Sequence, residues 1–533
     1  MNMKPDRARK KIFLLLTELW CDKRKLLQLG LFLILIVLFG ITRLWKLTIL
    51  PYGMHIDEAS MTYTAWSLSE YGVDRYLNPW PVYFSNFDSG QSAMYVYLCV
   101  ALFKILGYHL SLVRLPAVLF SFLNLTFGIL TARKIFPQNK IIPLSVGGLI
   151  VICPYFIMAG RFALDCNLML GMSTIFLYYF ISAIECGQIG KYTLAGLTGG
   201  LMLYTYALSY IALPVFLILA LVYLIRVKAF SLKGWFSMAV PMGILAFPLI
   251  LVQIVTIFDL AQFRLGCFSI TKLERNRAAE LGKFSYEGLR DTFDVIFAGD
   301  ALNYNTAPGY KTLYGLTIVL FFLGLDIILR SFWKSTRDRK LDFQTFPLLW
   351  LISMLFLGTV TAVSVNRMNS IFYSIVFFAA LGVNGLYTMF KKHSIIVITL
   401  ISIIYLLNFV KFANYYYSGS YTEENFMLLL FDIPVTEATD FIEQDSVLCQ
   451  KKTQMAEPGI YYLLEKPKSP YELDIRKLET EHCYENYLFE TLGTIEDQYN
   501  YIVTDNFYEY SEKLRAAGFA EEHYQKYSLF FKK

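Results

Sequence analysis

Long uninterrupted apolar runs are the feature that most limits what this chain can fold into. The runs are roughly 17–23 residues long, the length that an α-helix needs to cross the hydrocarbon core of a bilayer. Inside a membrane every backbone N–H and C=O must find its partner within the protein, so such runs form helices. The sequence therefore predicts a polytopic α-helical membrane protein. Eleven candidate spans are 27–47, 112–130, 141–159, 168–184, 193–208, 209–226, 235–257, 313–330, 346–363, 371–390 and 394–412.

The composition supports this class. The chain is 56% hydrophobic and 17% aromatic, whereas soluble domains are about 45–50% apolar. The net charge of +6 conceals an uneven distribution, because residues 413–533 hold 11 basic and 22 acidic side chains. The basic excess lies in residues 1–26 and in the short loops between spans, which indicates membrane orientation rather than nucleic-acid binding. No cleavage site follows the basic N-terminus, so the first span is predicted to be a retained anchor.

Loop charges predict which segments face the cytoplasm. Cytoplasmic loops of membrane proteins are enriched in Lys and Arg, which places the basic N-terminus and the loops 133–140, 185–191, 226–233, 330–340 and 391–392 inside. The least certain segment is 193–226, which forms either one span or two. The segments then predicted to lie outside the cytoplasm are loop 48–111, turn 160–167, turn 204–210, loop 258–312, turn 364–370 and the tail 413–533.

The outer segments carry predicted structure of their own. In the first outer loop, 56–71 reads as a helix with Gly72 as its C-cap, and the 14-residue run 93–106 reads as an interfacial helix. The composition of the tail 413–533 changes sharply and predicts a small α/β domain, in which Cys449 and Cys483 either pair or remain independent thiols. Its predicted elements are a helix at 435–441, a strand at 447–449, a strand at 499–503, a helix at 510–517 and a strand at 527–531.

An adjacent acidic pair, Asp57 and Glu58, follows the first span. Ionisable groups held near hydrocarbon are expensive, so they are functional candidates. Neighbouring residues on a helix do not face each other, and we therefore give Asp57 the central role and Glu58 a supporting one. The competing interpretation is a solvated helix start, where acidic residues favour the helix dipole.

Other outer turns supply cations and hydrogen-bonding groups. Arg161 and Asp165 would share a helical face at i,i+4, either as part of a site or as an ordinary ion pair. Arg367 lies in a predicted outer turn, although basic residues are more frequent in cytoplasmic loops. Its planar guanidinium suits phosphate oxygens; the alternative is a contact with a lipid headgroup. The supporting candidates are His55, Asn366, Asn369, Tyr204 and Tyr206, of which the tyrosines equally suit an aromatic belt.

The order of these motifs resembles a known family. A span is followed by His55-Ile56-Asp57-Glu58-Ala59, a Gly90–Tyr97 helix start, Arg114-Leu115-Pro116, Arg161 with Asp165, and Asn366-Arg367 before a late span. Over roughly residues 27–412 this resembles the membrane-integral glycosyltransferases of the C-type fold, in the bacterial protein mannosyltransferase and aminoarabinose transferase-like group. The Pro-Pro-Leu usual in that group is replaced by Gly90-Gln91-Ser92, which puts the donor or the acceptor in question.

The resemblance implies a reaction and a location. Such enzymes move a sugar from a polyprenyl phosphate to an acceptor outside the cytoplasm, which can be a protein, a lipid or a cell-envelope glycan. Asp57 matches the general base or metal ligand, Glu58 the second acidic residue, and Arg161 and Arg367 the groups that hold the donor phosphate. A divalent cation, Mg²⁺ or Mn²⁺ on Asp57 and Asp165, is compatible with this scheme. The implied location is the bacterial cell membrane, with residues 1–26 cytoplasmic, 27–412 transmembrane and 413–533 extracellular.

The chemistry also fits the residues taken alone. A carboxylate can take the proton of an acceptor hydroxyl, and Arg or a divalent cation stabilises a leaving phosphate. Two other functions compete with transfer of a single sugar. A lipid-linked glycan transporter or flippase would show repeated halves with charges at mid-membrane, but the sequence has no such repeat and Asp326 is the one acidic residue inside a span. A cell-wall glycan polymerase or ligase would share the same outer site.

Overall fold

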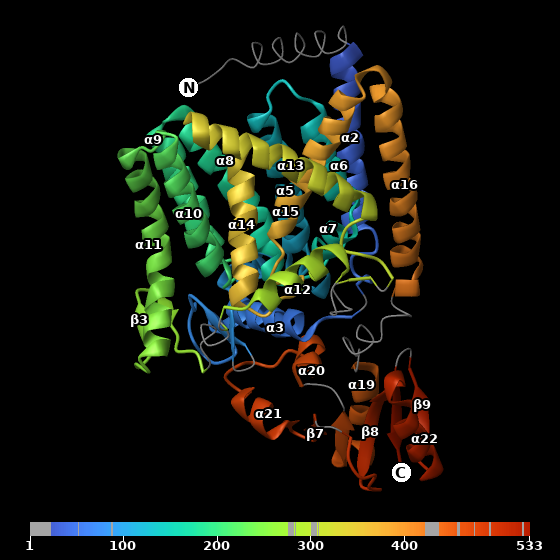
Figure 1. Ribbon diagram of the computed structural model, residues 1–533. Coiled ribbons are helices and arrows are strands. Elements are labelled where there is room, and N and C mark those ends of the chain that lie inside the picture. The colour runs from blue at the N-terminus through green and yellow to red at the C-terminus, as the bar shows by residue number, and fades with distance from the viewer. Residues whose placement is uncertain are drawn as a thin grey trace, which may run out of the picture.

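A bundle of apolar helices makes up most of the molecule (Figure 1). The computed structural model describes residues 23–51, 53–86, 89–274, 282, 284–299, 306–307, 309–421, 436–455, 459–473, 475–489, 492–524 and 527–533. The bundle helices are α2 (Lys23–Leu44), α5 (Leu115–Ile135), α6 (Ile141–Ile152), α8 (Cys166–Cys186), α9 (Ile189–Met202), α10 (Ser209–Arg226), α11 (Leu232–Ile257), α13 (Gly315–Asp338), α14 (Thr345–Val360), α15 (Ile371–Met389) and α16 (Ser394–Ser418).

Each of the eleven predicted spans overlaps one of these helices. Within the described residues, seven helical segments are long and apolar enough to cross a membrane, and α2, α6 and α14 are shorter apolar helices. The molecule is therefore a helical membrane protein, while the number of crossings stays a prediction. The Lys23 end of α2 and the C-terminal unit lie at opposite ends of the bundle (Figure 1), and which end faces the cytoplasm also stays a prediction.

Two helix breaks refine the predicted spans. Segment 193–226 is two helices, because the amides of residues 203–205 bond three residues back rather than four and end α9 before α10 begins. The predicted span 141–159 is instead broken into α6 and α7 (Pro154–Ala159). Pro154 lacks an N–H and forces the residue before it out of helical geometry, which explains why Cys153 is extended, with ψ 140°.

Glycines bring pairs of bundle helices into close contact. A Cβ added to Gly324 of α13 would overlap the carbonyl of Phe378, and one added to Gly382 of α15 would overlap the carbonyl of Leu320. Small residues that let two backbones approach closely are the usual packing device between helices in membranes. The buried side chains of these helices form one large apolar core.

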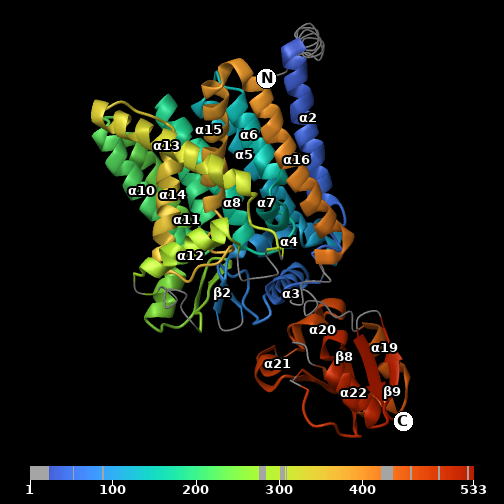
Figure 2. The same cartoon turned by 45° about the vertical axis from the view of Figure 1, so that its right-hand side comes forward.

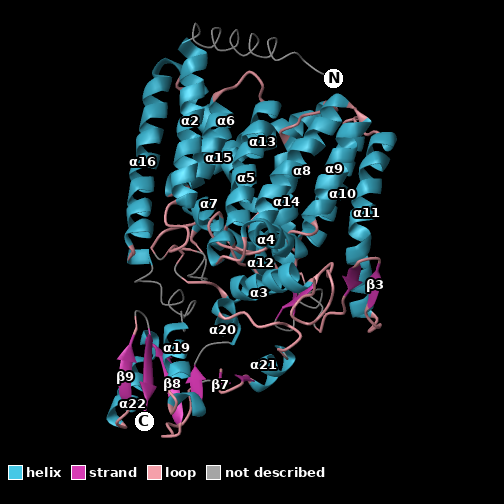
Figure 3. Cartoon of the chain, turned by 180° about the vertical axis from the view of Figure 1, so that it is seen from behind, coloured by secondary structure: helices cyan, strands magenta, loops and turns pink. Residues whose placement is uncertain are grey.

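The loop that follows α2, predicted to lie outside the cytoplasm, contains both predicted helices, and it lies at the end of the bundle nearest the C-terminal unit (Figure 3). Helix α3 (Ile56–Tyr71) ends at Gly72, whose φ of 72° is the left-handed conformation that glycine adopts without strain. Helix α4 (Ala93–Leu106) matches the predicted run. Between them, β1 (Phe84–Asn86) and β2 (Ser89–Gln91) form an antiparallel hairpin, which the sequence did not predict. The second long loop carries another hairpin, β3 (Phe263–Leu265) with β4 (Phe268–Ile270), and helix α12 (Tyr286–Phe297).

The C-terminal unit is a six-stranded mixed sheet with short helices (Figure 2). The strand order is β6-β7-β5-β8-β10-β9, in which β5 runs parallel to β7 and β8, and β10 runs antiparallel to β8 and β9. The strands are β5 (Lys452–Met455), β6 (Cys483–Tyr484), β7 (Tyr487–Leu488), β8 (Tyr499–Thr504), β9 (Ala520–His523) and β10 (Tyr527–Phe531). The helices are α19 (Thr436–Gln444), α20 (Gly459–Glu465), α21 (Ile475–Glu481) and α22 (Tyr508–Ala516).

Most of the predicted α/β elements are present, with one exception. The helix at 510–517 and the strands at 499–503 and 527–531 are confirmed, and α19 covers the described part of the predicted 435–441 helix. The predicted strand at 447–449 is wrong. Asp445 Oδ1 accepts the amides of Val447 at 2.9 Å and Leu448 at 3.1 Å, which holds this stretch in a turn. Cys449 and Cys483 are separate thiols.

Candidate active site

The segment that connects α2 to α3 is held by two buried arginines. Arg161 donates from Nη1 to the carbonyls of Thr42 and Arg43 at 3.1 and 2.8 Å, and from Nη2 to those of Trp45 and Leu50 at 2.7 and 2.9 Å. The residue is fully buried, and its guanidinium lies over the rings of two tyrosines at the end of α16. Four backbone carbonyls therefore share the positive charge of Arg161.

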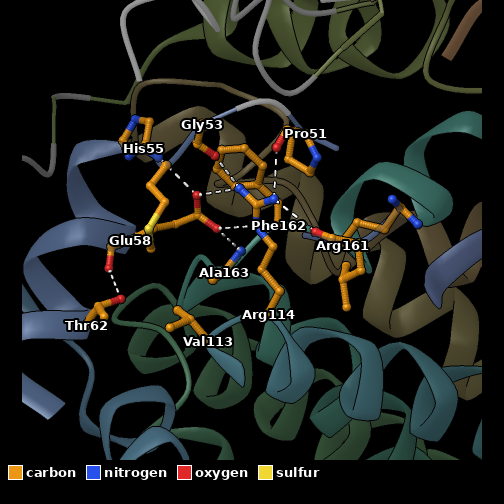
Figure 4. A network of polar contacts seen from close by, with 12 residues as sticks. Pro51, Gly53, His55, Glu58, Thr62, Val113, Arg114, Arg161, Phe162 and Ala163 are labelled. Atoms are coloured by element: carbon orange, nitrogen blue, oxygen red, sulfur yellow. Dashed lines mark hydrogen bonds and ion pairs between the residues drawn. The ribbon is translucent and has the colours of Figure 1, made fainter. Parts of the chain in front are cut away.

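Arg114 holds the next part of the same segment. Its Nη1 donates to the carbonyls of Leu47 at 3.1 Å and Pro51 at 2.8 Å, and its Nη2 donates to the carbonyl of Gly53 (Figure 4). Arg114 precedes α5, whereas Arg161 follows α7. Two parts of the chain far apart in sequence thus fix the path that leads into α3.

Glu58 is buried at the centre of this network (Figure 4). Its Oε1 accepts from the Ala163 amide at 2.6 Å and from Arg114 Nε at 3.3 Å. Its Oε2 accepts from the His55 amide at 3.0 Å and from Arg114 Nη2 at 3.3 Å. The His55 contact completes a capping box at the start of α3. With each oxygen bonded twice, Glu58 is a buried, fully paired carboxylate whose contacts are all to the protein.

Asp57, one residue earlier, has the opposite environment. Its side chain is 42% exposed, and Asn86 Nδ2 donates to its Oδ1 at 3.0 Å. His55 Nδ1 lies 3.6 Å from Oδ2, but this nitrogen already accepts the Asp57 amide at 3.1 Å. Among the described residues, no hydrogen bond reaches Oδ2, so this oxygen is open to an external donor.

The expected pairing of Arg161 with Asp165 is not formed. Asp165 Oδ2 accepts the amide of Ser92, which precedes α4, at 3.1 Å, while Arg161 is committed to the carbonyls described above. The guanidinium of Arg161 is fully buried against these carbonyls, and its expected role toward a donor phosphate stays a prediction. The described residues contain no group of three His, Cys, Asp or Glu side chains that could hold a metal, and a divalent cation on Asp57 and Asp165 stays a prediction.

The other predicted candidates are spread over several turns. Arg367 is half-buried and donates to the carbonyl of Ala362 at 3.2 Å, and Asn366 beside it is also half-buried. Asn369 is buried and donates to the carbonyl of Cys166, which ties the turn before α15 to the start of α8. Tyr204 and Tyr206 lie in the turn between α9 and α10, where the Tyr204 hydroxyl donates to the carbonyl of Leu245 at 2.8 Å and Tyr206 is buried.

A cavity of about 170 Å³ lies beside the Glu58–Arg114 pair, between the first loop and the C-terminal unit. Arg114 and Gly53 line it from the bundle side, and Tyr461 and Leu464 of α20 line it from the other side. The cavity places a guanidinium next to an apolar wall. It is lined by Leu47, Thr48, Gly53, Met54, Leu110, Ser111, Arg114, Tyr461 and Leu464.

Sequence reasoning did not select two residues that define this site, Arg114 and Asn86. Arg114 carried a usable signal, because it is an arginine at the predicted outer end of a span, out of step with the charge rule in the same way as Arg367. Asn86 carried none, since its position depends on a hairpin that the sequence did not predict.

Comparison with solved structures identifies the fold of this chain. No protein-family model matches the chain, and no curated protein matches it in sequence. Among solved structures, ArnT from Cupriavidus metallidurans bound to undecaprenyl phosphate matches with a TM-score of 0.54 over 94% of this chain and 97% of that one, at 9% sequence identity. The apo form of the same protein matches over the same shares with a TM-score of 0.52. The chain has the ArnT fold.

The match covers more than the helical bundle. A share of 94% of the chain exceeds what residues 27–412 alone could supply, so the ArnT-like part extends into the C-terminal unit. The predicted C-type glycosyltransferase fold is confirmed. At 9% identity the ArnT likeness concerns the fold, and function has to be argued from the side chains.

Proposed function

We propose that this protein is a glycosyltransferase that moves a sugar from a polyprenyl-phosphate donor to a hydroxyl acceptor on the extracytoplasmic side of the bacterial cell membrane. The observation that carries the proposal is the half-exposed Asp57, with an open Oδ2, at the start of α3 in a chain with the ArnT fold. Support for the donor class comes from undecaprenyl phosphate, which is bound in one of the matching ArnT structures.

Asp57 supplies the base in this reaction. An acceptor hydroxyl is a poor nucleophile until its proton is removed, and a carboxylate within hydrogen-bond reach can remove it. The proton moves to Asp57 Oδ2 as the acceptor oxygen bonds to the anomeric carbon of the sugar. The bond from that carbon to the phosphate oxygen breaks, and its electron pair leaves with the polyprenyl phosphate.

The leaving phosphate needs positive charge nearby, because it gains charge as the bond breaks. Arg367 is the cation that we retain for this role, since its side chain is half-buried in the turn before α15 and its planar fork suits phosphate oxygens. Arg114 and Glu58 act differently in this scheme. They fix the start of α3, and with it the position of Asp57.

The test measures transfer from radiolabelled polyprenyl-phosphate sugars to envelope acceptors in membranes that contain the wild-type protein, Asp57→Asn, or the control Asp326→Asn. Asp326 is an exposed partner of Arg330 on α13, far along the chain from the site. We expect Asp57→Asn to lower transfer by at least about 100-fold, the lower range for losing a general base, and the control to stay within about twofold. Full transfer by Asp57→Asn would remove this residue from the mechanism. Sugar-lipid flux across vesicles without any change in a glycosidic bond would support a flippase instead.

A further inference from the structure

The contact that orients Asp57 comes from a residue outside the expected catalytic set. Asn86, the last residue of β1, donates from Nδ2 to Asp57 Oδ1 at 3.0 Å. Its Oδ1 accepts from Ser60 Oγ at 2.5 Å and from Arg75 Nη2 at 3.1 Å. Ser60, Arg75 and Asn86 are each at most 3% exposed. The half-exposed carboxylate is therefore bonded to Asn86, which two other buried polar side chains hold in place.

The chemistry of Arg75 determines which way the Asn86 amide points. A guanidinium has only donors, so the amide atom that faces Arg75 has to be the oxygen. The NH₂ end must then point to Asp57, where it can only donate. Asn86 can therefore only donate to Asp57 Oδ1. Without Arg75, the amide could turn over and present its oxygen to Asp57 instead.

Local structure fixes Arg75 and Ser60 in turn. Asp74 Oδ1 accepts the amides of Tyr76 at 2.9 Å and Asn78 at 2.8 Å, a turn that sets the backbone on both sides of Arg75. Arg75 also lies over the ring of Tyr76, with 5.0 Å between Cζ and the ring centroid. Ser60 is three residues after Asp57 on α3, on the same helix face.

We infer that Asn86 is a positioning residue for Asp57, an inference that rests on the proposed function. Its hydrogen bond holds Oδ1 in place, because the amide that donates it is itself fixed by Ser60 and Arg75. Oδ2 is then left directed at the acceptor hydroxyl. His55 cannot replace Asn86, because its Nδ1 accepts the Asp57 amide and a ring nitrogen that accepts carries no proton to donate.

The test compares Asn86→Ala and Asn86→Asp with the control Asn486→Ala. Asn486 is an exposed asparagine of the C-terminal unit whose Nδ2 donates to a backbone carbonyl at 3.0 Å. We expect Asn86→Ala to lower kcat at least about tenfold, with the donor KM within about twofold. Asn86→Asp has a similar size but no amide donor, so it should not restore kcat. The control should match the wild type in kcat and in KM.

A second readout does not depend on turnover. Water-soluble carbodiimide with glycinamide labels accessible carboxyl groups, and mass spectrometry of the peptide that contains Asp57 follows the labelling rate at one fixed pH. The rate should rise in Asn86→Ala, which frees Oδ1, with a smaller rise in Ser60→Ala, which removes only one bond to the amide oxygen. An unchanged labelling rate and an unchanged kcat in Asn86→Ala would overturn the inference. Full activity of Asp57→Asn together with faster labelling of Asp57 in Asn86→Ala would instead overturn the proposed function and leave the Asn86 contact standing.

Discussion

Asp57 and Glu58 are neighbours in the chain, and the structure gives them different surroundings. The sequence identified the pair and favoured Asp57 as the reactive member because adjacent helix residues point in different directions. It could not show that Glu58 is buried, because its partners Arg114 and Ala163 come from later parts of the chain. For the same reason nothing near Arg161 in sequence indicates that it binds four carbonyls of residues 42–50; its role toward a phosphate came from the family resemblance and stays a prediction.

Glu58 provides a prediction at this scale. Glu58→Ala would leave the Arg114 guanidinium buried without its carboxylate, and removing one partner of a buried pair costs about 3–5 kcal/mol. We expect the variant to melt several degrees below the wild type in detergent, followed by intrinsic fluorescence. The control Asp497→Ala removes an ion pair of the C-terminal unit whose aspartate is 78% exposed, a type of pair that contributes about 0–1 kcal/mol, so its melting temperature should hardly change. If Glu58→Ala melted like the wild type but lost transfer, Glu58 would be a reacting group.

At the scale of the helix, local signals predicted boundaries well. The ends of α3 and α4 agree with the predicted ranges because each is set by nearby residues, such as Gly72 after α3. Predictions failed where a side chain redirected the backbone, as Asp445 does before β5, or where a proline split a predicted span, as Pro154 does between α6 and α7. The β1–β2 hairpin was missed because its strands have three residues each, too few to show an alternating pattern.

The contact between α13 and α15 gives a prediction for helix packing. A methyl group on Gly382 would overlap the carbonyl of Leu320, so Gly382→Ala should push the two helices apart and lower the melting temperature by several degrees. Gly243→Ala in α11 is the matched control, because a Cβ there meets nothing within 4 Å, and alanine favours a helix over glycine by about 1 kcal/mol. The two variants should therefore shift melting in opposite directions. Equal melting temperatures would mean that α13 and α15 tolerate separation.

At the scale of the whole molecule, the C-terminal unit is joined to the candidate active-site helix (Figure 2). Ala59 and Tyr63 of α3 belong to the same apolar cluster as Ile460 and Tyr461 of α20. The Tyr63 hydroxyl donates to the Lys468 carbonyl at 2.8 Å, and the Tyr461 hydroxyl donates to the Met54 carbonyl at 3.0 Å. The sequence predicted a separate α/β domain and left its role open, since contacts between distant segments carry no local pattern.

These contacts predict that the C-terminal unit remains attached after the chain is cut. A protease site introduced between Tyr421 and Thr436 allows cleavage in detergent, and size-exclusion chromatography then shows whether the two pieces elute together. We expect co-elution for the cleaved wild type and release for Tyr63→Ala combined with Tyr461→Ala, which removes apolar contact and both hydroxyl bonds. Tyr508→Ala is the control, because this side chain is 64% exposed. Separation of the cleaved wild type would mean that the covalent connection, not the interface, keeps the unit attached.

The two arginines that gather the carbonyls of residues 42–53 also bear on how the protein is made. The first membrane helix leaves the ribosome long before Arg114, and longer still before Arg161. Until both have been synthesised and inserted, the peptide that leads to Asp57 has no partners for these oxygens. The segment that leads to Asp57 is therefore completed only when the third of the bundle helices, α6, has been made, and nascent chains that stop short of Arg161 would lack four of its contacts.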